Sequence, residues 1–267
     1  MYEEHFGLRP RPFGEGGGPS GLVPLASREA ARRRLRYGLE HGQGPALLFG
    51  APGTGKTTLA RALARDLGGP WAHLAFPAMP AADLMAYIAD ELRAPAARGP
   101  GLGGSVARLR DGLAASARRG ERPLLIVDEA HLIDDPATFE TLRLVLNFAT
   151  LGPSDLSLLL VGGPEILLRL PHALADRMTA RCLLGPLTAA ESSAYIAGRV
   201  EAAGATVPLF DDESLAELHR AADGLPRRLN RLADLSLLIA YAEGAPRVGI
   251  SSVVAASREA MFGALAA

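Results

Sequence analysis

The hydrophobic and polar positions of the chain follow two patterns in succession. Up to about residue 187, short apolar runs alternate with longer stretches in which apolar residues recur at helical spacing. The apolar runs predict five strands, at residues 46–49, 71–76, 124–128, 156–162 and 181–184. Helices are predicted between them at residues 27–40, 58–67, 81–92, 106–119, 136–150 and 165–180. Such alternation predicts a parallel sheet with right-handed crossovers, which binds ligands at the carboxyl ends of its strands.

Capping and helix-breaking residues set some of the expected boundaries. Ser27 is expected to cap the helix at residues 27–40, and Pro171 to interrupt the helix at residues 165–180. The Gly- and Pro-rich residues 94–105 predict a flexible loop.

After Pro186 only the helical pattern remains. Thr188 and Glu191 match a capping box that opens a helix reaching to about residue 203. Further helices are predicted from about residue 211, over residues 226–242, and briefly after residue 251. The sequence thus predicts a P-loop α/β domain at residues 1–187, with an N-terminal segment at 1–40, followed by a small all-helical lid domain at 188–267.

Composition narrows the class of protein. The 267 residues are 48% hydrophobic, enough for a sizeable core, and the net charge of −1 gives no global attraction to nucleic acid or membranes. The single cysteine, Cys182, excludes a disulfide within the chain and is expected to be a buried strand residue in a reducing compartment. The N-terminus lacks a signal-peptide pattern, and no apolar run approaches the ~20 residues of a spanning helix. We therefore expect a soluble, cytoplasmic protein without membrane insertion.

Residues 50–57, GAPGTGKT, match the P-loop pattern in full and lie between a predicted strand and a predicted helix. Backbone N–H groups of this loop, together with the helix N-terminus, are expected to hold the phosphates of ATP. Lys56 is expected to reach the β and γ phosphates, and the Thr57 hydroxyl to coordinate Mg²⁺. Lys56 is the single lysine among 28 basic residues, which indicates that a compact ammonium is required there. The predicted nucleotide-binding residues are Gly50, Ala51, Pro52, Gly53, Thr54, Gly55, Lys56, Thr57 and Thr58.

Residues 124–129, LLIVDE, form an apolar strand that ends in two carboxylates. After a P-loop in this order, Asp128 is expected beside the Mg²⁺ ion, and Glu129 is expected to polarise the water that attacks the γ phosphate. Taken alone, the same pattern fits an ordinary turn at the end of a strand. His131 leaves two interpretations open, a γ-phosphate sensor or a helix-capping residue.

Arginines near the last strand and in the lid are candidates for stabilising phosphate charge. Arg177 and Arg181 share a face if they are helical, and an arginine there could project across a subunit interface to a neighbour's γ phosphate. The alternative is a solvated pair. In the lid, Pro226 fixes the start of a helix, and Arg227 is favoured over Arg228 to fold back onto bound nucleotide.

Two further arginine clusters, at residues 32–36 and 118–119, are candidates for contact with nucleic acid. A solvated helix face explains them equally well, because no aromatic residue interleaves them.

Together these residues resemble the general secretion pathway protein A (ExeA) family of AAA+ ATPases over nearly the whole chain. Besides the P-loop, the likeness is carried by residues 2–13, 28–30, 37–39, 128–130, 140–147, 161–165, 177–187, 195–196 and 224–227. Gly163 stands where the family usually has Gln, and His131 replaces a common Gln. The chain resembles a short form of the family, without the transmembrane and peptidoglycan-binding parts of its longer members.

The resemblance implies an Mg²⁺-dependent AAA+ ATPase whose N-terminal segment brackets the adenine and whose lid sensor is Arg227. It also implies homo-oligomers, as rings or filaments, that complete each active site with an arginine in trans. The expected function is an ATP-driven assembly switch for a larger machine, such as a secretion or pilus-type system. Two alternatives remain: a DNA-associated ATPase similar to the MuB and TniB transposition proteins, and a nucleotide-binding scaffold with little turnover, which Gly163 motivates.

Overall fold

The computed structural model describes residues 1–14, 22–41, 44–94, 99, 101–149 and 155–265, and it divides into two compact units. The sheet unit comprises Ala30–Pro52 and Lys56–Leu184, and the helical unit comprises Met1–Glu29, Gly53–Gly55 and Gly185–Ala267. The change of pattern expected at residue 187 thus falls close to the observed change at Gly185. The sequence predicts that residues 1–40 belong to the P-loop domain. In the structure, the first 29 residues group with the helical unit instead.

The sheet unit is built on five parallel strands, which confirms the predicted α/β fold. The strands are β1 (Ala46–Phe49), β2 (Trp71–Leu74), β3 (Leu124–Val127), β4 (Ser157–Gly162) and β5 (Ala180–Leu183), in the spatial order β2-β3-β4-β1-β5. β3 and β4 are buried at every position, as is typical of parallel strands covered on both faces. Cys182 lies buried in β5 as predicted, and burial raises the pKa of its thiol.

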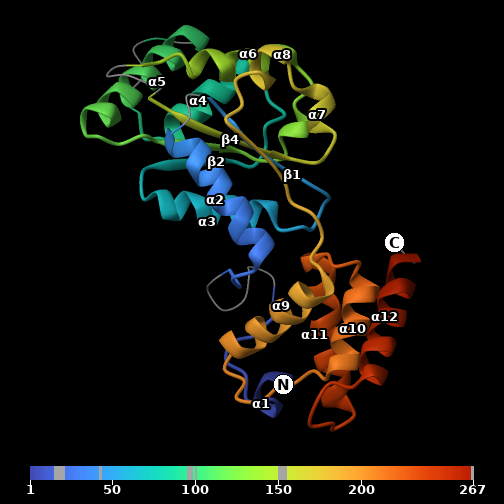
Figure 1. The fold of residues 1–267 in the computed structure, drawn as a ribbon. Helices are drawn as coiled ribbons and strands as arrows, with labels where there is room; N and C mark the ends of the chain where they lie inside the picture. Colours follow the sequence, from blue (N-terminus) through green and yellow to red (C-terminus); the bar gives the residue numbers. More distant parts are fainter. Residues whose placement is uncertain (15–21, 42–43, 95–98, 100, 150–154, 266–267) are drawn as a thin grey trace. The chain divides into compact units, whose positions relative to one another are not determined.

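Helices cover both faces of this sheet. They are α2 (Ala26–His41), α3 (Lys56–Leu67), α4 (Ala81–Glu91), α5 (Gly101–Arg118), η1 (Ala130–Leu132, a 3₁₀ helix), α6 (Pro136–Val145), α7 (Ile166–Arg169) and α8 (His172–Ala175). Figure 1 shows α2 and α3 on one side of the sheet and α4, α5 and α6 on the other.

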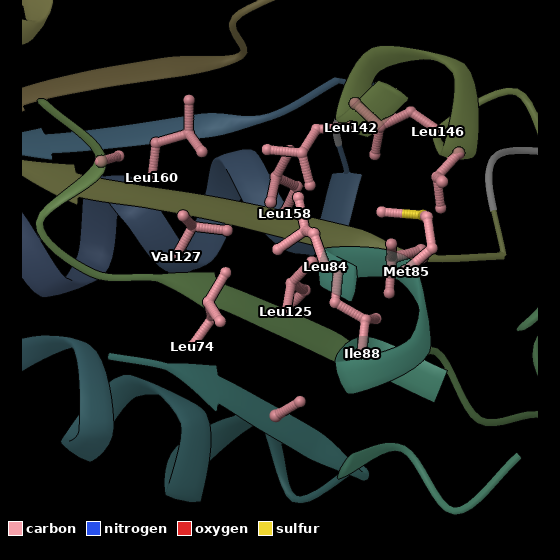
Figure 2. Close-up of a cluster of buried hydrophobic side chains, with 14 of the residues drawn as sticks. Leu74, Leu84, Met85, Ile88, Leu125, Val127, Leu142, Leu146, Leu158 and Leu160 are labelled. Carbon is pink, nitrogen blue, oxygen red and sulfur yellow. The ribbon is translucent and has the colours of Figure 1, made fainter. Parts of the chain in front are cut away.

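The largest core of the sheet unit lies between the strands and α4 (Figure 2). Alternate residues of β3 and β4 point to the same side of the sheet, and α4 covers them with one apolar face. The contacting side chains are Leu125, Val127, Leu158 and Leu160 of the strands and Leu84, Met85 and Ile88 of α4. Each is at most 1% exposed, so each stabilises the unit by about 1.5–3 kcal/mol relative to an exposed side chain.

Several boundaries differ from the sequence prediction. Ser27 lies inside α2 instead of capping it, and its backbone N–H donates to Glu191 Oε1 (2.9 Å). The loop predicted at residues 94–105 is already helical from Gly101, because α5 packs along α4 and this packing outweighs the poor helix propensity of glycine. Residues 95–98 and 100 of that loop, like residues 15–21 of the Gly-rich N-terminal stretch, lie outside the described residues.

The helical unit contains α1 (Tyr2–His5), α9 (Ala189–Ala202), α10 (Asp212–Ala222), α11 (Pro226–Ala242) and α12 (Ile250–Leu265). The capping box predicted at Thr188 and Glu191 is present, and α11 begins at Pro226 as predicted. The last helix, α12, is longer than the short helix expected there. Within the described ranges, no helix combines the length and the apolar character needed to cross a bilayer.

The N-terminal segment is part of the core of the helical unit. Its large apolar side chains, Tyr2, Phe6, Leu8 and Phe13, are buried against residues of α9, α10 and α11. The Tyr2 hydroxyl donates to Asp234 on α11 (2.6 Å), and the buried Arg199 of α9 donates from Nε to the carbonyl oxygen of Pro12 (2.8 Å). Burial, followed by the Asp234 carboxylate, raises the pKa of the Tyr2 hydroxyl. These contacts explain why the first residues group with the helices.

Candidate nucleotide-binding site

The loops that follow β1, β3 and β4 leave the sheet at the same edge. β4 pairs with both β1 and β3, all in parallel, so the carboxyl ends of the three strands lie side by side. The P-loop follows β1, Asp128 and Glu129 follow β3, and Gly163 follows β4. The topology therefore brings together two motifs that are far apart in the sequence.

The P-loop adopts a backbone conformation that depends on its glycines. Gly53 and Gly55 have φ angles of +82° and +92°, in the left-handed region that residues with a Cβ rarely adopt. α3 begins at Lys56, so the unpaired N–H groups of its first turn face the loop. Thr54 is buried, whereas Thr58 is exposed on the first turn of α3. A glycine-rich loop that opens a helix in this way is suited to bind phosphate.

The Lys56 side chain folds back over the loop. Its ammonium donates to the carbonyl oxygens of Gly50 (2.9 Å) and Ala51 (3.1 Å), and the residue is 8% exposed. The positive charge is therefore held inside the loop, where phosphate oxygens can replace the carbonyl acceptors. A compact ammonium with three donors fits this position, whereas the planar guanidinium of arginine does not match it.

The P-loop is linked to the end of β3 by a hydrogen bond. The Thr57 hydroxyl donates to Asp128 Oδ2 at 2.7 Å, and Asp128 Oδ1 accepts the backbone N–H of Glu129 at 3.0 Å. A hydroxyl that gives its proton to a carboxylate keeps its lone pairs for a cation, and Mg²⁺ prefers such oxygen ligands. In the described part of the chain, no group of three or more His, Cys, Asp or Glu side chains is placed to hold a metal.

Glu129 and His131 lie in the turn after β3. Glu129 has a φ angle of +48°, and its carboxylate is 47% exposed, so water can reach it. His131 Nδ1 accepts the backbone N–H of Gly163 (3.1 Å) and lies 3.5 Å from Glu129 Oε2. A single ring nitrogen cannot accept the Gly163 N–H and also donate to Glu129. The contact with Gly163 is the shorter of the two, so Nδ1 is the acceptor and the imidazole proton is on Nε2. The His131 ring thus joins the end of β4 to the turn that carries Glu129, a role that differs from helix capping.

Arg177 and Arg181 are not on one helix, so they do not share a helical face. Arg177 follows α8 and donates to Asn147 Oδ1 (2.9 Å), while Arg181 lies exposed in the edge strand β5 and donates to the Ala175 carbonyl oxygen (2.6 Å). Among the described residues, neither guanidinium bonds to the P-loop or to Asp128.

In the helical unit, Arg227 and Arg228 have different surroundings. The backbone N–H of Arg227 donates to the Gly53 carbonyl oxygen (3.2 Å), whereas the Arg228 guanidinium is paired with Asp223 (2.5 Å). Arg227 is thus the arginine of this pair that lies at the P-loop segment.

The sequence reasoning missed some residues close to these motifs. His73, on β2, has its Nε2 3.2 Å from Asp128 Oδ2, and the Arg61 guanidinium lies 3.3 Å from His73 Nδ1. A single histidine in a strand carries no motif, so only the pairing of β2 with β3 reveals the first contact.

Comparison with known proteins identifies the family of the chain. A family model described as an AAA domain matches residues 39–170. The chain is an AAA+ P-loop protein. It is 37% identical to general secretion pathway protein A of Aeromonas hydrophila over 93% of this chain and 46% of that protein, which confirms the resemblance seen in the motifs. The chain spans less than half the length of this relative.

Solved structures of AAA+ proteins share the fold. Cdc6p of Pyrobaculum aerophilum matches with a TM-score of 0.74 at 21% identity, over 93% of this chain and 70% of that one. The ORC2 protein of Aeropyrum pernix, solved in ADPNP-ADP complexes, matches with a TM-score of 0.71 at 19% identity, over 94% and 72%. The Thermotoga maritima RuvB Holliday junction branch migration motor gives a TM-score of 0.59 at 21% identity, over 86% and 68%. At these identities the matches show the fold alone, and they confirm the AAA+ architecture.

Proposed function

We propose that this AAA domain binds ATP with Mg²⁺ and hydrolyses it. The observation that carries the proposal is the 2.7 Å hydrogen bond between Thr57 and Asp128, next to a P-loop whose single ammonium points inward. This arrangement provides a phosphate cradle, a cation and a metal position at one sheet edge. The ORC2 protein, which shares the fold, was solved in ADPNP-ADP complexes, and this supports nucleotide binding by the present chain.

Each residue of the candidate site has its own role in ATP binding and hydrolysis. Backbone N–H groups of the P-loop and Lys56 hold and orient the phosphates, and Thr57 with Asp128 holds Mg²⁺, which neutralises phosphate charge when bound. The Glu129 carboxylate, exposed to solvent, orients a water molecule and accepts its proton. His131 keeps the Glu129 turn in register with the end of β4. Gly163 has no side chain, and the Glu165 carboxylate and the His131 imidazole are polar groups close to its Cα.

The residues named above include no cation on the far side of the γ phosphate, and a neighbouring copy of the chain would supply it. We assign that role to Arg177, with Arg181 as the alternative, acting on the nucleotide of a neighbouring copy in a ring or filament. Arg227, which lies at Gly53, is the lid residue expected to respond to bound nucleotide. The similarity to general secretion pathway protein A favours an ATP-driven assembly switch for a larger secretion or pilus-type machine in the cytoplasm.

Calorimetry with the Lys56→Ala variant tests the nucleotide site. ATP binding should be lost, since even one charge-assisted hydrogen bond contributes about 1.5–3 kcal/mol. Lys56→Arg should bind as poorly, because the guanidinium does not fit the loop, while Arg65→Ala on the same helix should bind like the parent. Equal ATP affinity in the parent and Lys56→Ala would refute the proposed site. A parent chain that binds ATP without turnover would instead identify a nucleotide-binding scaffold.

A DNA-associated function is the second candidate, and one surface favours it. Tyr37 on α2 is 69% exposed and stacks on His41 (ring centroids 4.6 Å apart), on a helix that also exposes Arg33 and Arg34. An exposed aromatic ring beside arginines can stack on a base while the charges contact phosphates. Fluorescence anisotropy with labelled single-stranded DNA should then show affinity that falls steeply with salt and falls again in Tyr37→Ala. Absence of salt-dependent binding would exclude this function.

A further inference from the structure

His73 lies beside the carboxylate that we assign to Mg²⁺. β2 pairs in parallel with β3, with His73 opposite Ile126, and the imidazole extends to Asp128 just beyond the end of β3. The His73 side chain is 14% exposed and that of Asp128 is 6% exposed, so water competes little for their contact. The imidazole belongs to neither the P-loop nor the LLIVDE motif.

The neighbour of His73 fixes which ring nitrogen carries the proton. The Arg61 Nη2 lies 3.3 Å from His73 Nδ1, and a guanidinium has donors only. Nδ1 must therefore accept this bond, which leaves the proton on Nε2. The Nε2–H then donates to Asp128 Oδ2 across 3.2 Å.

The Asp128 carboxylate is thus held by three donors. Oδ1 accepts the Glu129 backbone N–H, and Oδ2 accepts both the Thr57 hydroxyl and the His73 ring. The first two donors belong to the LLIVDE motif and the P-loop. The His73 bond adds an anchor from a neighbouring strand, and this anchor prevents the carboxylate from rotating away from Thr57.

We propose that His73, oriented by Arg61, is a positioning residue for Mg²⁺, because it fixes Asp128 so that the Thr57 hydroxyl presents its lone pairs to the metal. Hydrogen bonds to metal-binding groups commonly have this effect, and their loss weakens metal binding about 10–100-fold. This inference rests on the proposed Mg²⁺-nucleotide function. It adds a group that acts on metal affinity without touching the nucleotide.

The test measures ADP affinity by calorimetry with Mg²⁺ and with a chelator, so that no turnover is needed. In the parent chain the ratio of the two affinities reports the contribution of the metal. His73→Ala should reduce this ratio roughly ten-fold while metal-free ADP binds as in the parent. His73→Gln, whose amide can donate from a similar position, should restore most of the ratio, which a purely structural role would not explain.

Two exposed arginines of α3 provide a second test variant and a matched control. Arg61→Ala should lower the ratio in the same direction by a smaller factor, whereas Arg65→Ala, one turn further along, should leave it unchanged. Arg61→Ala also keeps the proposal testable if His73→Ala does not fold. An unchanged ratio in folded His73→Ala, or an equal loss of affinity with and without Mg²⁺, would overturn the inference. A parent chain that binds no nucleotide, or shows no Mg²⁺ effect, would overturn the proposed function and this inference with it.

Discussion

Replacing Arg177 with alanine distinguishes a catalytic arginine from a surface residue by the size of the effect. Within its own chain Arg177 is half-buried, and among the described residues its side chain makes one hydrogen bond, to Asn147 Oδ1 at 2.9 Å. Its loss should lower the free energy of unfolding by about 0.5–1.5 kcal/mol. An arginine that stabilises phosphoryl transfer in a neighbouring active site contributes ~10³-fold or more in turnover. That factor corresponds to about 4 kcal/mol, well above the structural effect.

The assay is ATP turnover over a range of protein concentrations. In the parent, specific activity should rise with concentration because each site needs a neighbour, and Arg177→Ala should lose turnover while its ATP affinity stays close to that of the parent. Asn147→Ala is the matched control, since it removes the same hydrogen bond and keeps the arginine. Mixing Arg177→Ala with Lys56→Ala should partly restore activity, because the first variant keeps an intact P-loop and the second can supply an arginine.

Arg177 has no role in trans if specific activity is independent of protein concentration and mixing the two variants restores no turnover. If Asn147→Ala loses as much turnover as Arg177→Ala, the shared hydrogen bond accounts for the loss, and the experiment gives Arg177 no role in trans. A similar experiment with Arg181→Ala decides between the two candidates.

Three further changes test other parts of the molecule. Glu129→Gln should keep ATP bound but slow hydrolysis ~10²–10⁴-fold because the proton acceptor is lost, and unchanged turnover would show that another group activates water. Arg199→Met removes the donors to the Pro12 carbonyl oxygen, so hydrogen exchange of residues 1–13 should accelerate while the sheet unit stays protected; uniform exchange rates would contradict the packing described for this segment. Asp211 caps α10, and hydrogen bonds from Ser214 lower the pKa of its carboxyl group. Its contribution to the stability of the fold is therefore present above the unfolded pKa of about 3.9. This contribution is lost as the pH falls through the lower pKa of the folded state. Asp211→Ala should therefore cost about 1 kcal/mol in urea unfolding at pH 7, and less in acid, where an undiminished difference would argue against the cap.

The features that could be predicted from the sequence are those whose residues are close together along the chain. The P-loop, the LLIVDE strand and the Thr188–Glu191 capping box each carry their own spacing, so local patterns were enough to place them. Pro226 marked the start of α11 for the same reason. The residues that we expect to bind phosphate and Mg²⁺ belong to two short motifs, which the order of the strands brings to one edge of the sheet.

Features that depend on distant partners could not be predicted in this way. The sequence order predicts that the first residues belong to the P-loop domain. Their aromatic side chains are instead buried among the helices of the other unit, because packing determines where they lie. Gly101 begins a helix against its own propensity because α5 packs along α4. His73 became significant only when strand pairing set it next to Asp128. The roles of Arg177, Arg181 and Arg227 stay predictions, since they concern bound nucleotide and neighbouring copies.

The hydrogen bond from Gly163 to His131 links the turn after β3 to the chain that leads to Arg177, and it therefore bears on the order in which subunits hydrolyse ATP. It fastens the turn that carries Glu129 to the first residue of a segment that continues through α7 and α8 and ends at Arg177. If Glu129 acts on water as proposed, a shift of its turn would be transmitted through this bond to the start of the segment that holds the arginine. In an assembly where Arg177 serves the next subunit, the nucleotide state of one copy would set the readiness of its neighbour. Hydrolysis would then proceed in order from subunit to subunit instead of at random.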